Sequence, residues 1–171
     1  MLLPEQSVQE TRGILVIGIG NQYRSDDAVG LRIAQDVKKE ADSSIKIIEQ
    51  NSDGAALLDS WKDAGMVILI DAVSSGGRPG SIYRFDAHKQ PLPSRFFHYS
   101  THAFGVAEAV ELAKTLGQLP QSLIVYGIEG KCFDVGVGLT GEVENAIGDV
   151  VIRIRQDIHN QSLRKHGESL R

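Results

Sequence analysis

The sequence is poor in the residues that cross-link chains or bind metals as thiolates. Its 171 residues include one cysteine, Cys132, and five histidines, so an internal disulfide and a zinc site of clustered thiolates are both excluded. Any metal site must therefore use carboxylates and at most a few imidazoles. The start of the chain, MLLPEQ, lacks the basic and apolar segments of a signal peptide. We therefore expect a protein of the reducing cytoplasm.

Long apolar runs and a strong excess of either charge are also missing. The most continuous apolar stretch, Met66 to Ile70, is followed at once by Asp71, whereas a spanning helix needs roughly 20 residues. Eighteen basic residues against 22 acidic ones give a net charge of −4, which supplies no general attraction for nucleic acid or for an anionic membrane surface. We expect a soluble protein that binds neither.

The length and composition indicate one domain. Hydrophobic residues make up 42% of the chain, enough for a single core, and no repeat or low-complexity block interrupts it. Both ends are polar and show no periodicity. We predict one domain over residues 13–158, with poorly ordered termini at 1–12 and 159–171.

Short β-branched runs alternate with helical patterns along this domain. Met66 to Ile70 has the unbroken apolar character of a strand covered on both faces. The alternation predicts an α/β fold, a three-layer sandwich in which helices cover both faces of a twisted, mainly parallel sheet of about five strands. The predicted strands lie at 14–17, 45–48, 66–70, 81–85 and 123–126, and the predicted helices at 29–37, 53–61, 103–116 and from 141 to 158.

The densest motif, GIGNQYRSDDAVG, joins the first strand to the first helix, from Gly18 to Gly30. A dinucleotide-binding fingerprint would need a third glycine where Tyr23 stands. Gly130-Lys131 is not part of a Walker loop, and neither HExxH nor GxSxG occurs. Phosphate binding at the glycine turn stays open as an alternative, because glycine turns before helices attract anions.

Three side chains follow three different strand-like segments. Asp26 and Asp27 open the first helix, where Ser25 can cap and where the helix dipole favours carboxylates. Asp71 stands at the carboxyl end of the most apolar strand, where open α/β sheets bind ligands. His102, after a predicted N-cap at Ser100 or Thr101, would project towards the same edge.

Each of these residues also has an ordinary structural role open to it, since acidic first turns and loop-capping carboxylates are common. Taken together, Asp27, Asp71 and His102 make a set of two carboxylates and one imidazole that could take nickel, zinc or manganese in an open coordination sphere. Cys132 could be a reactive thiol, but a small buried filler is the more ordinary role.

The motifs GIGNQYRSDDAVG, VILIDAV and STHAFGVAEAV, in this order from Ile14 to about Ile154, resemble those of the hydrogenase maturation endopeptidases. That family removes the C-terminal extension from the large-subunit precursor of [NiFe]-hydrogenases. The resemblance implies a mainly parallel sheet between helices, and it places the family's nickel-binding residues, which are also its catalytic ones, on Asp27, Asp71 and His102. Ala28, where many members have glycine, and Gly130, where proline is expected, depart from the pattern and affect local loop shape.

The resemblance also implies an unusual use of metal. No nickel is held permanently; the nickel already inserted in the precursor is recognised, and cleavage follows, with a monomeric protease expected to act on that precursor. Nickel could polarise the scissile carbonyl or acidify a water, with Asp27 or Asp71 as the base. Two alternatives remain: a metallochaperone or assembly checkpoint that binds the same precursor without cutting it, and a small-molecule enzyme that binds phosphate.

Overall fold

The protein is described from a computed structural model, which covers residues 12–97 and 104–168. Its strands and helices alternate along the chain, with two short 3-10 helices between them. The strands are β1 (Ile14–Ile19), β2 (Ile45–Gln50), β3 (Met66–Val73), β4 (Ile82–Asp86) and β5 (Ser122–Glu129). The helices are η1 (Ser25–Ala28), α1 (Val29–Glu40), α2 (Gly54–Ser60), η2 (Ser94–Phe97), α3 (Val106–Thr115) and α4 (Gly141–Glu168).

The five strands form one sheet in the order β2-β1-β3-β5-β4. β1 pairs in parallel with β2 and β3, β3 pairs in parallel with β5, and only β4 runs antiparallel, at the edge beside β5. β3 lies in the centre and all eight of its residues are buried, as its unbroken apolar run predicts. The predicted five-stranded, mainly parallel α/β fold is confirmed.

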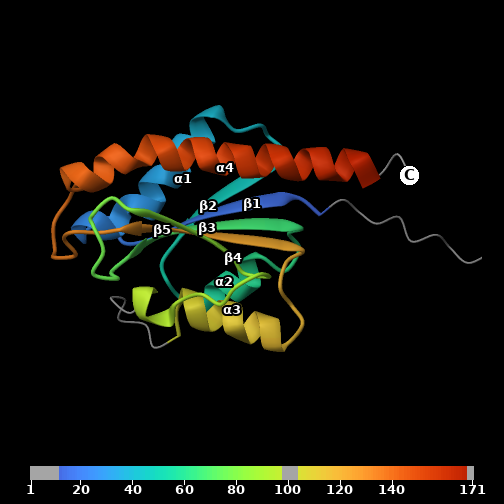
Figure 1. Ribbon diagram of the computed structural model, residues 1–171, viewed down its shortest axis with the longest axis horizontal. Coiled ribbons are helices and arrows are strands. Elements are labelled where there is room, and N and C mark those ends of the chain that lie inside the picture. The colour runs from blue at the N-terminus through green and yellow to red at the C-terminus, as the bar shows by residue number, and fades with distance from the viewer. Residues whose placement is uncertain (1–11, 98–103, 169–171) are drawn as a thin grey trace, which may run out of the picture.

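Helices cover both faces of the sheet, which gives the predicted three layers (Figure 1). One apolar cluster fills the space between the sheet and α2 and α3 and includes Trp61, Leu69 and Val110. The other lies between the sheet and α1 and α4 and includes Ile33, Ile68 and Ile147. Because neighbouring residues of a strand point to opposite faces, Ile68 and Leu69 belong to different clusters. Within the described part of the chain, no helix is both long and apolar enough to cross a bilayer.

Some element boundaries differ from those that the sequence predicts. α3 begins at Val106, three residues later than predicted, and Gly105 is its N-cap, with the Gly105 N–H donating to the Glu108 carboxylate at 3.1 Å. α4 continues beyond the predicted domain end at Ile158 as far as Glu168. No proline interrupts these residues, and the Ser162 hydroxyl donates to the Ile158 carbonyl at 3.1 Å along the same helix.

A partly buried polar contact ties α4 to the sheet. The Tyr126 hydroxyl, on a side chain with no exposed surface, donates to Asp157 of α4 at 2.6 Å. Arg84 of β4 donates two further hydrogen bonds to the same carboxylate, at 2.8 and 3.0 Å. Burial, and then the hydrogen bond to Asp157, raises the pKa of the Tyr126 hydroxyl, which therefore stays protonated and keeps donating. These contacts fix the register of α4 on β4 and β5.

We predict that Asp157→Ala lowers the free energy of unfolding by about 2–3 kcal/mol, because it leaves the buried Tyr126 hydroxyl without its acceptor and Arg84 without its partner. Asp157→Asn, which retains an acceptor, should cost about 1 kcal/mol. Urea unfolding measures both changes. Asp149→Ala, which removes an exposed carboxylate of the same helix, is the matched control. If Asp157→Ala lowers the free energy of unfolding by no more than this control does, the contact is not stabilising.

Candidate active site

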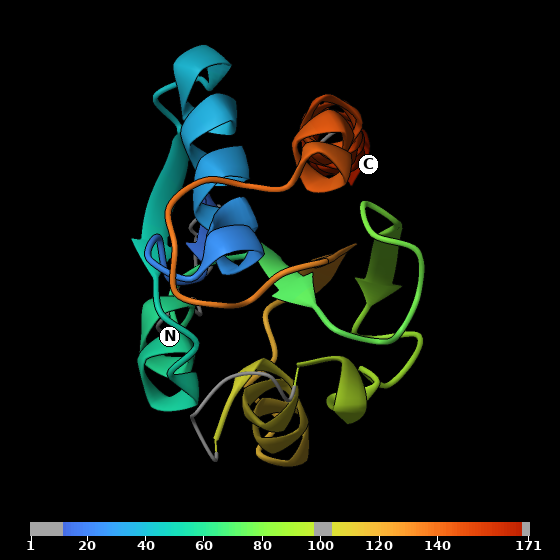
Figure 2. The ribbon, with the colours of Figure 1, turned by 90° about the vertical axis from the view of Figure 1, so that its left-hand side faces the viewer.

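The parallel strands β1, β3 and β5 end at one edge of the sheet, where three connecting segments meet. Figure 2 looks onto this edge: the orange segment from β5 to α4 passes beside the blue segment that leads into α1, and the green segment after β3 lies to one side. In open α/β sheets this carboxyl edge is where ligands bind. The predicted residues Asp27 and Asp71 lie on two of the elements that meet here.

Asp71 lies inside β3, two residues before its end, rather than directly after it as the sequence predicts. The strand is longer than its apolar run because β5 continues alongside it, with Asp71 opposite Gly127. The last β3 residue paired with β1 is Ile70, so Asp71 comes just beyond the end of the pairing between β1 and β3. Its side chain is 2% exposed and, by alternation, lies on the face covered by α2 and α3.

Asp27 belongs to η1, a 3-10 turn that precedes α1, and is partly buried. Two glycines permit the close approach of this turn to the strand ends. A Cβ on Gly20, whose φ is +154°, would lie 1.9 Å from the Asp27 carbonyl oxygen, and one on Gly30 would lie 2.3 Å from the carbonyl oxygens of Ile19 and Ile70. The start of α1 therefore rests on the ends of β1 and β3, and η1 contacts β3. This packing brings Asp27 and Asp71 to the same edge.

The predicted cap at Ser25 is wrong. Ser25 has a positive φ of 49°, and among the described residues no side chain caps η1 or α1. The Ser25 hydroxyl donates instead to the carbonyl oxygen of Asp134, at 3.0 Å. The Ser25 hydroxyl thus helps to hold the segment between β5 and α4. The residues next to Ser25 in the sequence give no sign of this distant contact.

Asp26, the neighbour of Asp27, is a buried carboxylate that accepts hydrogen bonds on both of its oxygens. Its side chain has no exposed surface. One oxygen accepts from the N–H groups of Lys131 and Cys132, at 2.8 and 2.9 Å. The other accepts from the N–H of Thr140 at 2.7 Å, and the Thr140 hydroxyl lies 2.9 and 3.1 Å from the two oxygens. Burial by itself would raise the pKa of Asp26, but the hydrogen bonds from Thr140, Cys132 and Lys131 outweigh it and lower that pKa.

The segment held by Asp26 also pairs with the chain before η1. The Ser25 N–H donates to the Gly136 carbonyl at 3.0 Å, and the Gly136 N–H donates to the Tyr23 carbonyl at 2.9 Å. The Asp26 N–H donates to the Cys132 carbonyl, also at 3.0 Å. Residues 131–140 are therefore fastened to residues 23–26 at several points, although more than 100 positions separate the two segments in the sequence.

A second buried carboxylate fixes the segment after β3. Glu129, at the end of β5, is 2% exposed. Its oxygens accept from the N–H and hydroxyl of Ser75, at 2.9 and 2.6 Å, and from the N–H of Gly76, at 3.1 Å. The loop that follows β3 is thus also held by a buried carboxylate.

The remaining predicted site residues have different outcomes. His102 and its predicted caps Ser100 and Thr101 lie outside the described residues. Within residues 12–97 and 104–168, no three His, Cys, Asp or Glu side chains gather in a way that could hold a metal ion, and the set of Asp27, Asp71 and His102 stays a prediction. Cys132 is partly buried, and its main chain serves the contacts with Asp26.

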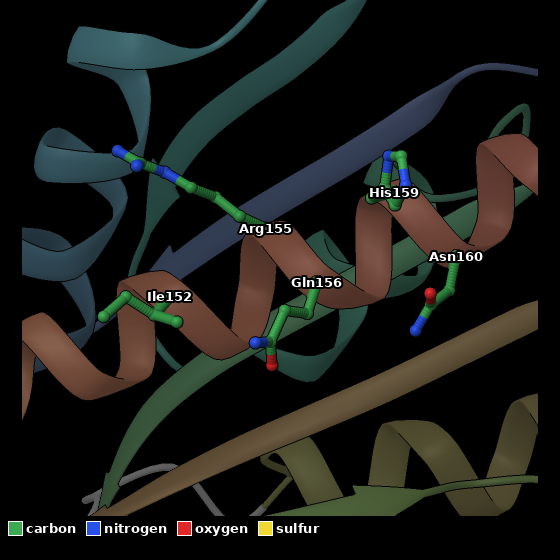
Figure 3. A pocket seen from close by; sticks show the side chains of 5 residues that line it. All are labelled: Ile152, Arg155, Gln156, His159 and Asn160. Carbon is green, nitrogen blue, oxygen red and sulfur yellow. The ribbon is translucent and has the colours of Figure 1, made fainter.

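The glycine turn proposed as a phosphate site is used for packing. A Cβ on Gly18 would lie 2.4 Å from the Gly30 carbonyl oxygen, and the Gly20 N–H donates to the Gln50 carbonyl at 3.0 Å. A hollow along α4 also differs in character from the carboxylate edge. Figure 3 shows its lining, Ile152, Arg155, Gln156, His159 and Asn160, which all come from one helix and include no carboxylate.

Asp26, Thr140 and Glu129 are the residues of this edge whose roles the sequence does not reveal. In the sequence, Asp26 is indistinguishable from Asp27 as one of two adjacent carboxylates. Most of the donors to Asp26 and Glu129 are main-chain N–H groups, which every residue except proline carries. A threonine directly before the long amphipathic helix is the one sequence signal, and it is typical of ordinary helix starts.

The known proteins that this chain resembles in sequence point to one family. Residues 32–157 match the sequence profile of the hydrogenase maturation proteases. The match includes Asp71 and begins after Asp27. The hydrogenase 2 maturation protease of Escherichia coli K12 is 28% identical over 138 residues, which are 78% of this chain and 83% of that protein. The hydrogenase expression/formation protein HupD of Thiocapsa roseopersicina is 28% identical over 137 residues, which are 78% of this chain but only 62% of that protein.

Solved structures show the same fold. The hydrogenase maturating endopeptidase HybD from Escherichia coli superposes with a TM-score of 0.75 at 23% identity, over 87% of this chain and 93% of that one. The [NiFe] hydrogenase maturation protease HycI from Thermococcus kodakarensis superposes with a TM-score of 0.65 at 21% identity, over 85% of this chain and 91% of that one.

We predict that Asp26→Asn lowers the free energy of unfolding by about 2 kcal/mol at pH 7, because an amide cannot accept from donors on both of its sides. The pKa of Asp26 is lower in the folded protein than its unfolded value near 3.8. The stabilisation from Asp26 is therefore present above pH 3.8 and is lost as the pH falls through the folded pKa. Unfolding curves at pH 7 and in steps below about pH 4 measure the effect.

The difference between wild type and Asp26→Asn should accordingly shrink in acid, whereas the exposed control Asp149→Asn should follow wild type throughout. A difference between wild type and Asp26→Asn that is absent at pH 7, or that grows below pH 3.8, would contradict the assignment.

Proposed function

Because the chain belongs to the hydrogenase maturation protease family, we propose that it is an endopeptidase that removes the C-terminal extension of a [NiFe]-hydrogenase large-subunit precursor. The observation that supports this most is that Asp27 and Asp71, from separate elements that contact each other, both lie at the carboxyl edge of the sheet. Two carboxylates at one edge of the sheet suit hydrolysis, since a carboxylate can act as general base or contact a metal ion.

We further propose that nickel belongs to the substrate and reports that the precursor is ready. Asp27, Asp71 and His102 offer two hard ligands and one borderline ligand but no thiolate, a set that binds a free nickel ion weakly. A nickel ion already held by thiolates of the precursor would need these three side chains only for its open coordination positions. The protease would then act on precursors that contain nickel and leave empty ones intact.

The reaction itself is peptide hydrolysis. Water adds to the scissile carbonyl carbon, the C–N bond breaks, and the proton that the water loses is passed to the departing amine. The base is Asp27 or Asp71, and the substrate's nickel supplies either polarisation of the carbonyl or acidification of the water. The buried position of Asp71, 2% exposed, strengthens its interaction with any cation that arrives at this edge.

The proposed working form is a monomer in the cytoplasm, where a reduced Cys132 and the thiolates of an immature precursor both persist. The partner is the precursor polypeptide. Neither nucleic acid nor a membrane is part of the proposal, and the net charge of −4 provides no general attraction for either.

We predict that Asp27→Asn, Asp71→Asn and His102→Ala each reduce processing of a nickel-loaded precursor by at least about 100-fold, since each removes a group that contacts the reacting centre. Mass spectrometry of the precursor before and after incubation measures the loss of its C-terminal peptide. Circular dichroism checks that each variant remains folded, and Asp149→Asn, remote in sequence from these groups, should process at the wild-type rate.

Failure of the wild-type protein to shorten its nickel-loaded cognate precursor would refute the endopeptidase. A nickel-dependent complex in which the precursor mass never changes would instead identify a checkpoint that binds without cutting. Equal processing of nickel-free precursor would refute the nickel-sensing part alone.

A further inference from the structure

Three exposed apolar side chains gather on the two segments that flank Asp26 and Asp27. Tyr23 is 60% exposed, and Val135 and Val137 are each 86% exposed. Tyr23 and Gly136 are joined through their main chains at 2.9 Å, so these three side chains belong to one stretch of surface, the apolar rim of the site. Other exposed large apolar side chains of the described residues lie on or beside helices α3 and α4. Exposing apolar side chains to water is unfavourable. A contiguous group of them is therefore typical of a surface that another molecule covers.

The main chain of the rim is open as well. Gly136 uses both its N–H and its carbonyl to pair with residues 23–25. In the part of the chain that the structure describes, the N–H and carbonyl groups of its neighbours Val135 and Val137 make no hydrogen bond. When a residue such as Gly136 pairs with a neighbouring segment, the main-chain N–H and carbonyl groups of the residues on either side of it point away from that segment. A second chain running past Val135 and Val137 could therefore pair with them.

The rim is held in place before any ligand arrives. Asp26 fixes both ends of the segment, through Lys131 and Cys132 at one end and Thr140 at the other. The Ser25 hydroxyl and the Arg24 side chain add hydrogen bonds to the main-chain carbonyls of residues 134 and 133, at 3.0 and 3.2 Å. A preformed surface binds with less loss of conformational entropy than a loop that must order on contact.

We propose that the apolar rim, Tyr23, Val135 and Val137, binds an extended apolar stretch of the substrate polypeptide next to its scissile bond. The occupant is a polypeptide because the rim offers alternating valine side chains together with open main-chain groups, the two features that extended peptides use when they dock on an edge. Its position follows from continuity with the site, since Asp27 lies in the same segment as Tyr23. This inference rests on the proposed function, and it assigns to residues outside the catalytic set the task of positioning the chain to be cut.

The test is a double variant, Val135→Ser with Val137→Ser, assayed on the nickel-loaded large-subunit precursor with its C-terminal extension. Both side chains are 86% exposed, so the thermal unfolding midpoint should stay at the wild-type value. The KM for the precursor should rise about tenfold, because the apolar contact is lost on binding, while kcat stays within about twofold. Val135→Ile with Val137→Ile, which keeps the surface apolar, should retain the wild-type KM.

Two control measurements separate the contribution of the rim from that of surface polarity and of catalysis. Ile152→Ser with Leu163→Ser removes two apolar side chains of α4 that are 54% and 57% exposed, and it should leave KM unchanged. Binding of the same precursor is measured separately in an Asp71→Asn background, with and without the rim substitutions, and the rim substitutions should weaken it about tenfold.

A wild-type KM and unchanged binding in the serine variant would overturn the rim proposal while leaving the endopeptidase intact. Binding that depends on the rim, without any cleavage by the wild-type protein, would support the rim and refute the proposed function. An equal loss in the α4 control would show that general surface polarity, and not the rim, governs binding.

Discussion

The carboxyl edge of this protein depends on one buried negative charge. The Asp26 carboxylate has no exposed surface, and a charge in that position is tolerated only when its oxygens are fully hydrogen-bonded. Its donors come from both ends of residues 131–140. The requirement to satisfy this one group therefore fixes where the connection between β5 and α4 runs, and with it the direction in which α4 starts across the sheet.

The same requirement helps to place the candidate site residue Asp27. Since Asp26 is locked, its neighbour Asp27 is held at the start of α1, and close glycine contacts seat that start on the ends of β1 and β3. Glu129 does for the segment after β3 what Asp26 does for the segment after β5. The edge thus contains two kinds of carboxylate: Asp26 and Glu129, whose hydrogen bonds organise loops, and Asp27 and Asp71, which the family resemblance assigns to chemistry. Because both loops are held by hydrogen bonds within the protein, the edge is formed before any substrate binds, as the proposed recognition of a nickel-loaded precursor would require.

The sequence predicts the layers of this fold well and its polar connections poorly. Apolar periodicity depends only on residue types, so the sequence predicts that Met66 to Ile70 and the α4 stripe from Val143 to Ile154 are buried, as they are in the two apolar clusters. The contacts made by Asp26 and Glu129 use mostly main-chain donors, which leave no trace in composition. Ser25 has the residue type of a cap but lies at a positive φ and donates across the fold. The charge of Asp71 ends the apolar run and so predicts a strand end, whereas the strand continues beside β5.

Amide hydrogen exchange tests most directly whether the Asp26 carboxylate organises the edge that carries the candidate site. Lys131, Cys132 and Thr140 lie outside regular strands and helices, so without a specific acceptor their N–H groups would exchange rapidly. We expect these three amides to be protected in the wild-type protein and to lose protection together in Asp26→Asn, while amides of β3 keep theirs. Rapid exchange at the three positions in the wild type, or protection that survives the substitution, would contradict this role of Asp26.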